Sequence, residues 1–89
     1  MVMRRDKLKI LAGILEICGG GGANKTKIVY GSNLNFKVAD VYLDMLIKEG
    51  LMNAIGPESR MKYHTTEKGL QVLGSIKEVY DHMEQFSLE

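Results

Sequence analysis

The 89-residue chain carries a single β-hairpin signal, and the position of this signal among four helical segments leaves few folds open. Two short, partly β-favouring runs, residues 51–55 and 61–65, are separated by Gly56-Pro57-Glu58-Ser59-Arg60, which is typical of a polar turn. Three helical segments precede this hairpin and one long helical segment follows it. The sequence therefore predicts a mainly α-helical domain with one small hairpin, an α+β fold.

The first helical segment is apolar around an unusually large part of its circumference. It is expected to start at Asp6 and to end at the four glycines of residues 19–22. Beside its main apolar stripe runs a second stripe, which consists of Ile10, Ile14 and Ile17. Packing on a domain surface requires only one stripe, so we expect a further element to cover the second.

The next two segments predict a pair of helices joined by a turn. The first helix is brief, opens at Ala23 and Asn24 with Asn24 as its cap, and stops at Gly31. The longer helix follows its cap, Asn35, and stops at Gly50. Its inward face is predicted to consist of Phe36, Ala39, Leu43, Leu46 and Ile47.

The last helical segment is predicted from Thr66 to about Phe86, which is roughly 30 Å long. Its apolar residues follow the spacing of a coiled-coil seam and extend past the reach of the domain, so a second copy of the helix is the expected cover. We expect a domain over residues 1–69 and a dimerisation helix over residues 70–89. The predicted homodimer interface consists of Ile10, Ile14, Ile17, Val72, Leu73, Ile76, Val79, Tyr80, Met83 and Phe86. The alternative is a last helix that folds back along its own domain.

Charge is distributed unevenly along the chain, although the net charge is only +1. Residues 1–30 contain six lysines and arginines against two acidic residues, and the residues from 70 onward are acidic. A basic end of this kind indicates an anionic partner.

Length and composition argue against several classes of protein. The chain suffices for one domain with little room for an enzyme pocket, and no pattern of nucleophile and base marks it as an enzyme. Cys18, His64 and His82 are too isolated to hold a metal, so no metal or other cofactor is expected. The glycine run of residues 19–22 resembles a phosphate-binding P-loop only in part, because a P-loop requires glycine where Asn24 stands. It therefore predicts a flexible turn and not a nucleotide site. One cysteine, no membrane-length apolar run and no signal core predict a soluble cytoplasmic protein.

The order helix, helix, helix, hairpin, helix is that of a winged helix-turn-helix, and two stretches make the resemblance specific. The first is Gly22-Ala23-Asn24-Lys25-Thr26-Lys27-Ile28 with Asn33-Leu34, Tyr42-Leu43, Leu46 and Gly50-Leu51; the second is Tyr63 with Thr66-Glu67-Lys68-Gly69. Both resemble a family of archaeal winged-helix proteins described as predicted transcriptional regulators. Small archaeal chromatin proteins of this type dimerise through an antiparallel coiled coil of the last helix, which the resemblance implies here. Gly31, Ser32 and Thr65 depart from the family pattern.

In such a fold the helix after Asn35 lies in the major groove of DNA, and the preceding helix crosses the backbone. Lys25 and Lys27 stand at a helix start, where the backbone amides and the helix dipole favour anions. Asp40 and Asp44 on the groove-facing side, beside two valines, predict weak sequence specificity. The predicted DNA-contacting residues are Arg4, Arg5, Lys25, Thr26, Lys27, Asn33, Asn35, Lys37, Val38, Val41, Arg60 and Lys62.

The predicted function is therefore that of a homodimeric protein that binds double-stranded DNA, as a transcriptional regulator or a chromatin-type architectural factor. The alternative is a winged-helix module for protein–protein interaction without DNA affinity, which Asp40 and Asp44 favour. A small-molecule sensor is the third class, but no convergent polar cluster marks a ligand site, so no small-molecule ligand is predicted.

Overall fold

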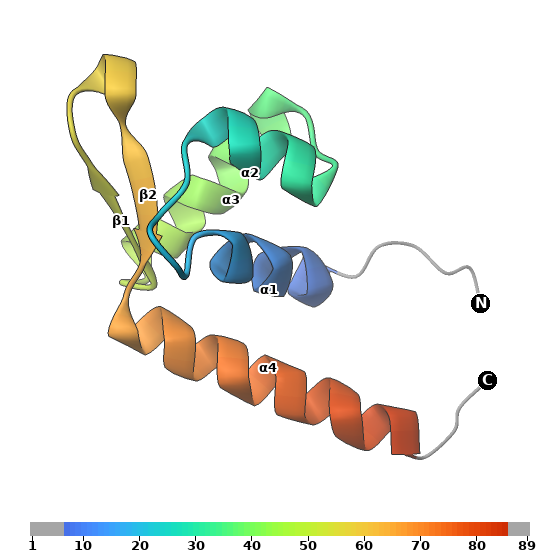
Figure 1. The fold of residues 1–89 in the computed structure, drawn as a ribbon. Coiled ribbons are helices and arrows are strands. Elements are labelled where there is room, and N and C mark those ends of the chain that lie inside the picture. Colours follow the sequence, from blue (N-terminus) through green and yellow to red (C-terminus); the bar gives the residue numbers. More distant parts are fainter. Residues whose placement is uncertain (1–6, 86–89) are drawn as a thin grey trace.

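A computed structural model describes residues 7–85 of the chain as four α-helices and one β-hairpin (Figure 1). The elements follow in the order α1 (Lys7–Ile17), α2 (Lys25–Ser32), α3 (Phe36–Lys48), β1 (Met52–Ile55), the short 3-10 helix η1 (Glu58–Arg60), β2 (Lys62–Thr65) and α4 (Glu67–Gln85). The predicted winged-helix fold with a long last helix is thereby confirmed. None of the helices described here is long and apolar enough to cross a membrane.

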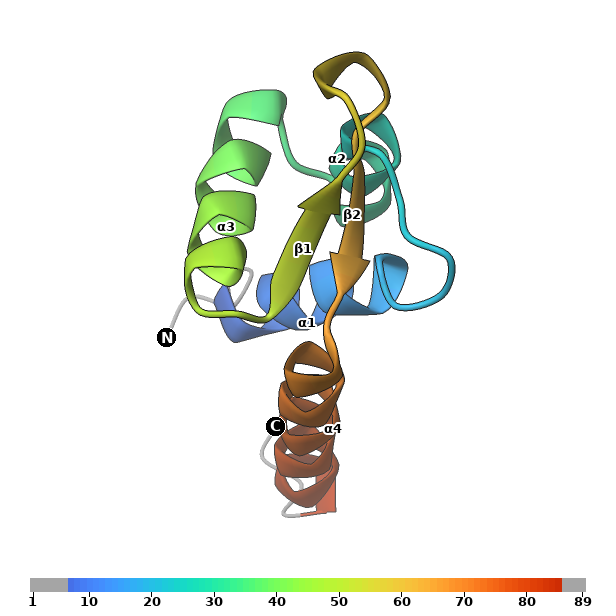
Figure 2. The ribbon, with the colours of Figure 1, turned by 90° about the vertical axis from the view of Figure 1, so that its left-hand side faces the viewer.

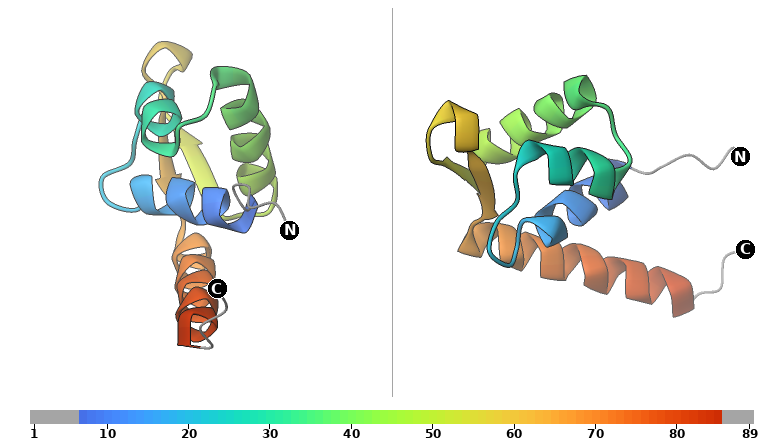
Figure 3. Two further views of the ribbon diagram at one scale, coloured as in Figure 1. Left: turned by 90° about the vertical axis from the view of Figure 1, so that its right-hand side faces the viewer. Right: turned by 45° about the horizontal axis from the view of Figure 1, so that its top comes forward.

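The elements are arranged in tiers. Figure 2 shows α3 and the hairpin standing over α1, while α4 projects below them. The two views of Figure 3 place α2 on the upper side with α3, so that α1 lies between this pair and α4. The hairpin tip stands beside the start of α2, and this upper side carries most of the predicted DNA contacts.

The core lies where α1, α2, α3 and the hairpin meet. Its largest fully buried side chains are Ile14, Leu15, Cys18, Ile28, Leu43, Leu46 and Met52. Both apolar stripes of α1 therefore serve the chain's own interior. Ile14 is 0% exposed, so its assignment to a dimer interface is wrong, and Ile10 and Ile17 pack half-buried against the same core.

The first half of α4 packs along α1 of the same chain. Leu73 and Ile76 are buried there, and Lys77 Nζ lies 3.1 Å from Glu16 Oε2 across the two helices. Lys9 Nζ lies 5.7 Å from the centre of the Tyr80 ring, within the range of a cation–π contact. This part of α4 thus folds back along its own domain, as the alternative prediction had it. Leu73 and Ile76 therefore leave little surface for a partner subunit.

The hairpin is antiparallel, with Met52 opposite Thr65 and Ile55 opposite Lys62. A third segment joins it, because Ala23 forms an isolated bridge with Tyr63 of β2. The prediction that Ala23 opens a helix is therefore wrong. Gly22, with φ +88°, makes the preceding turn, and a Cβ there would collide with the ring of His64. The end of the glycine run is thus held in place by the wing.

Two further predictions about helices are corrected by the structure. Gly31 does not stop α2, which continues through Ser32 and ends at Asn33 with φ 56°. Gly31 instead allows α2 to lie close to the end of α1, because a Cβ at this position would lie 2.8 Å from Ile17 Cδ1. On α3 only Ala39, Leu43 and Leu46 are buried. Phe36, in the first turn, is 49% exposed, and Ile47, which follows the buried Leu46, is 38% exposed.

The junction between β2 and α4 explains the Thr66-Glu67-Lys68-Gly69 motif. Thr66 Oγ1 accepts a hydrogen bond from Gly69 N at 3.0 Å and donates one to Gly50 O at 2.8 Å. Lys68 Nζ donates to Glu49 O at 3.2 Å, at the end of α3. A Cβ at Gly69 would collide with the Leu51 carbonyl. The motif therefore joins the start of α4 to the end of α3.

Candidate nucleic-acid interface

A cleft of about 530 Å³ separates the start of α2 from the tip of the wing. Asn24, Lys25 and Thr26 line one wall, and residues 58–63 line the other. Lys25 stands on the first wall, while Arg60 and Lys62 stand on the second. The structure thus brings together two groups of predicted DNA contacts that are far apart in the sequence.

Local capping explains how α2 presents its first turn to this cleft. Asn24 Oδ1 accepts a hydrogen bond from Lys27 N at 2.9 Å, so the predicted cap is confirmed. The first backbone amides of a helix have no acceptor within the helix, and the helix dipole makes this end attractive to anions. The amides of Lys25 and Thr26 belong to this turn, so one wall of the cleft favours a phosphate oxygen.

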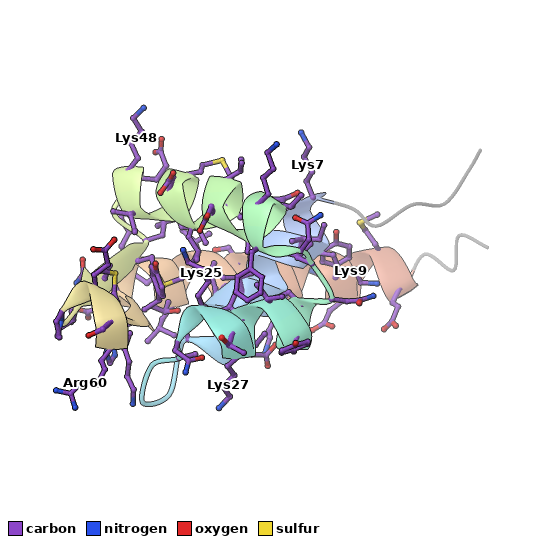
Figure 4. The ribbon with its side chains drawn as sticks, turned by 90° about the horizontal axis from the view of Figure 1, so that it is seen from above. Lys7, Lys9, Lys25, Lys27, Lys48 and Arg60 are labelled. Carbon is purple, nitrogen blue, oxygen red and sulfur yellow. The ribbon has the colours of Figure 1, made fainter. Side chains whose placement is uncertain are left out.

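The side chain of Lys25 is directed toward α3 (Figure 4). Its Nζ lies 2.6 Å from Asp40 Oδ1 on that helix. The hydrogen bond to Asp40 raises the pKa of Lys25, which keeps the ammonium group charged. Sequence reasoning treated Lys25 as a free cation, because the pair depends on the angle between α2 and α3, which no local pattern reveals.

The remaining cations of this side point outward. Figure 4 shows Lys27 on the outer edge of α2, away from α3, and Arg60 at the end of the wing. Lys62, the first residue of β2, is exposed at the edge of the cleft. Lys27 does not line the cleft and stands beside it. Lys27, Arg60 and Lys62 are therefore exposed along the α2–wing side, whereas Lys25 turns toward α3.

The outer face of α3 is mixed in character. Val38 and Val41 are exposed, Val41 by 64%, and Lys37 is exposed beside them. Asp44 lies on the same helix and is also exposed. This face offers apolar contacts and both signs of charge, but no arginine, asparagine or glutamine that could read a purine with two hydrogen bonds.

The family model described as winged helix-turn-helix matches residues 4–84. The chain belongs to this family. The resemblance to archaeal winged-helix proteins is confirmed, because the chain is also similar to Sso10a-2, described as a DNA-binding protein from Sulfolobus solfataricus. That structure matches with a TM-score of 0.83 and 32% sequence identity, over 93% of this chain and 86% of that chain.

Two other similarities are more distant. An uncharacterized protein of Methanocaldococcus jannaschii, MJ0287, is 29% identical over 80 residues, which is 90% of this chain and 78% of that protein. The structure of a MepR–DNA complex from Staphylococcus aureus matches with a TM-score of 0.71 and 15% identity, over 93% of this chain and 69% of that chain. At this level of identity the second match supports the fold alone.

In this winged helix-turn-helix, the two asparagines predicted to contact DNA stabilise the turn between α2 and α3. Asn33 adopts the left-handed conformation that ends α2. Asn35 Oδ1 accepts a hydrogen bond from Val38 N at 2.8 Å and so caps α3. Arg4 and Arg5, also predicted contacts, lie outside the described residues, as does Phe86.

Sequence reasoning missed two exposed aromatic residues on the helix-turn-helix. Tyr30 on α2 is 77% exposed, and Phe36, in the first turn of α3, was assigned to the core but is half exposed. The cap at Asn35 was a usable signal for Phe36, because a residue directly after a cap lies at the very end of its helix. No pattern in the sequence singles out Tyr30.

Proposed function

We propose that this winged helix-turn-helix protein binds duplex DNA through its α2–wing side, as a non-enzymatic transcriptional regulator or chromatin-type architectural factor. The observation that supports this proposal most is the cleft that the start of α2, with Lys25, lines on one side and Arg60 and Lys62 of the wing line on the other. Its similarity to Sso10a-2, described as a DNA-binding protein, supports the same function.

Phosphate contacts would provide most of the affinity. Lys25, Lys27 and the wing cations would bind backbone phosphates, which position a protein on DNA without reading its sequence. The start of α3 would enter the major groove, where Lys37, Val38 and Val41 meet base edges or thymine methyl groups. Arg4, Arg5, Thr26, Asn33 and Asn35 complete the proposed set of contacts. We expect affinity that varies little among DNA sequences.

We also propose that a homodimer forms through the outer face of α4. Val79 and Met83 of α4 are 49% and 48% exposed. Val79 also lines a groove with Leu8 and Val72. The proposed interface is narrower than the predicted one and is centred on Val72, Val79 and Met83, with Tyr80 at its border.

The DNA interface is tested by removing the wing cations and titrating a fluorescently labelled duplex. Arg60→Gln with Lys62→Gln removes two proposed phosphate contacts and should reduce the logarithmic salt slope by about 1.8. Lys7→Gln with Lys48→Gln is the matched control, because both lysines are exposed and Figure 4 shows them away from the wing tip. Equal losses in the two double variants would contradict the proposed interface.

The alternative function is docking of α3 on another protein. The exposure of Val41 and Phe36 and the carboxylates of Asp40 and Asp44 favour it. Such a module would show no salt-linked affinity for DNA, so the same titration on the wild-type protein distinguishes the two functions.

A further inference from the structure

Within the proposed DNA-binding side, one cation is already bound to an anion of the same chain. Lys25 Nζ and Asp40 Oδ1 are 2.6 Å apart, and their side chains are 36% and 51% exposed. The pair bridges α2 and α3, the two helices of the helix-turn-helix. A second ion pair, between Lys77 and Glu16, lies between α1 and α4, away from this side.

A carboxylate and a phosphate compete for an ammonium group because both offer anionic oxygens to the same three N–H donors. When DNA approaches, Lys25 either leaves Asp40 for a phosphate or keeps Asp40 and brings its carboxylate close to the phosphate. The first course loses an ion pair, and the second adds a repulsion between like charges. In both cases Asp40 weakens the binding of DNA.

We propose that Asp40 is a built-in competitor of the DNA phosphate for Lys25 and thereby limits the affinity of the protein for any duplex. This inference rests on the proposed function. The pair is solvent-exposed, and exposed ion pairs change an equilibrium constant by only about fivefold or less. Asp40 therefore restrains DNA binding without blocking it.

The restraint acts on all sequences alike, because a phosphate contact carries no base information. We expect the affinity of the wild-type protein to lie below the level that its cations alone allow.

The experiment is a double-mutant cycle on duplex affinity at constant low salt. Asp40→Asn should raise the association constant about tenfold, by freeing Lys25 and removing one negative charge near the phosphates. In the Lys25→Met background the same substitution should raise it only about threefold, because only the longer-range repulsion is then removed. Asp44→Asn is the matched control, because it makes the same charge change one turn further along α3, where no ion pair with Lys25 forms.

Three results would overturn the proposal: equal effects of Asp40→Asn and Asp44→Asn, an effect of Asp40→Asn that is the same with and without Lys25, or a loss of affinity in Asp40→Asn. The last result would mean that Asp40 positions Lys25 for DNA. If neither the wild-type protein nor Asp40→Asn binds duplex DNA at low salt, the proposed function fails as well. If the wild-type protein binds and the cycle shows no coupling, only this inference fails. Both aspartates are exposed, so the variants should retain the thermal unfolding transition of the wild-type protein.

Discussion

Ala23 and Tyr63 exchange two backbone hydrogen bonds, from Ala23 N to Tyr63 O at 3.0 Å and from Tyr63 N to Ala23 O at 2.8 Å. The bridge joins the residue before the cap of α2 to the inner strand of the wing. It therefore fixes the distance between the two walls of the cleft. The proposed phosphate contacts on α2 and on the wing depend on this connection.

Gly22→Ala should destabilise the protein by about 1–3 kcal/mol, because φ +88° is unfavourable for alanine and the new Cβ collides with the His64 ring. Gly20→Ala is the control, since a Cβ at Gly20 meets nothing within 4 Å. Urea unfolding followed by circular dichroism measures both. A similar free energy of unfolding for the two variants would show that the turn before Ala23 is not constrained by the wing.

Gly69→Ala should be at least as costly, about 2–4 kcal/mol, because its Cβ would collide with the Leu51 carbonyl, part of the backbone that anchors α4 to α3. Gly74→Ala in the same helix should instead stabilise an isolated subunit by about 0.5–1 kcal/mol, since alanine favours a helix and the site is open. Thermal and urea unfolding of the two variants should therefore differ in sign. Destabilisation by both would contradict the contacts described at Gly69.

Local signals in the sequence were sufficient for the caps and the hairpin. Asn24, Asn35 and the Gly56–Arg60 turn act within a few residues, so their roles follow from residue type and spacing. The bridge at Ala23 was not predictable in this way, because it depends on where the wing lies relative to the end of the glycine run. The ion pair of Lys25 with Asp40 could not be predicted either, because it depends on how α2 and α3 are placed relative to each other.

The prediction that a second subunit covers the whole apolar face of α4 was partly wrong for a related reason. The heptad-like spacing of Leu73, Ile76 and Tyr80 indicates that one face is covered, but it does not indicate by what. In the structure α1 covers this face, and Ile76 is buried by it. Val79 and Met83, further along the helix, stay 49% and 48% exposed. The spacing therefore predicted burial correctly but named the wrong partner for Leu73 and Ile76.

Because Cys18 is buried, the free energy of unfolding should depend on pH in the alkaline range. Desolvation raises the pKa of its thiol from 9.0 to about 11, with a smaller opposing effect of Lys27. The folded state keeps the thiol protonated while the unfolded state releases the proton above about pH 9, so the free energy of unfolding should fall between pH 9 and 11, by at most about 3 kcal/mol. Urea unfolding at several pH values measures the fall.

Cys18→Ala is the comparison, because it lacks the thiol and leaves every other side chain of the protein unchanged. The wild-type protein should lose more stability than this variant between pH 9 and 11. Parallel pH profiles would contradict the burial of the thiol as a neutral group.

Replacing Val79 and Met83 together by glutamine should convert the proposed dimer to a monomer, since it removes the two most exposed apolar side chains of the outer α4 face. Multi-angle light scattering measures the mass of each species. Glu78→Gln introduces the same residue at an exposed polar position of the same helix and should leave the dimer intact. A wild-type protein of monomeric mass at high concentration would refute the proposed assembly.

The central claim is that the side formed by α2 and the wing binds the backbone of duplex DNA. The most direct test is the salt dependence of wild-type affinity for a duplex of arbitrary sequence, measured from about 50 to 200 mM salt. With four to six phosphates neutralised per subunit, the logarithm of the association constant should fall with a slope of about 4 to 5 against the logarithm of the salt concentration, and change little with sequence. A protein that does not bind at the lowest salt, or whose affinity is independent of salt, would contradict the claim.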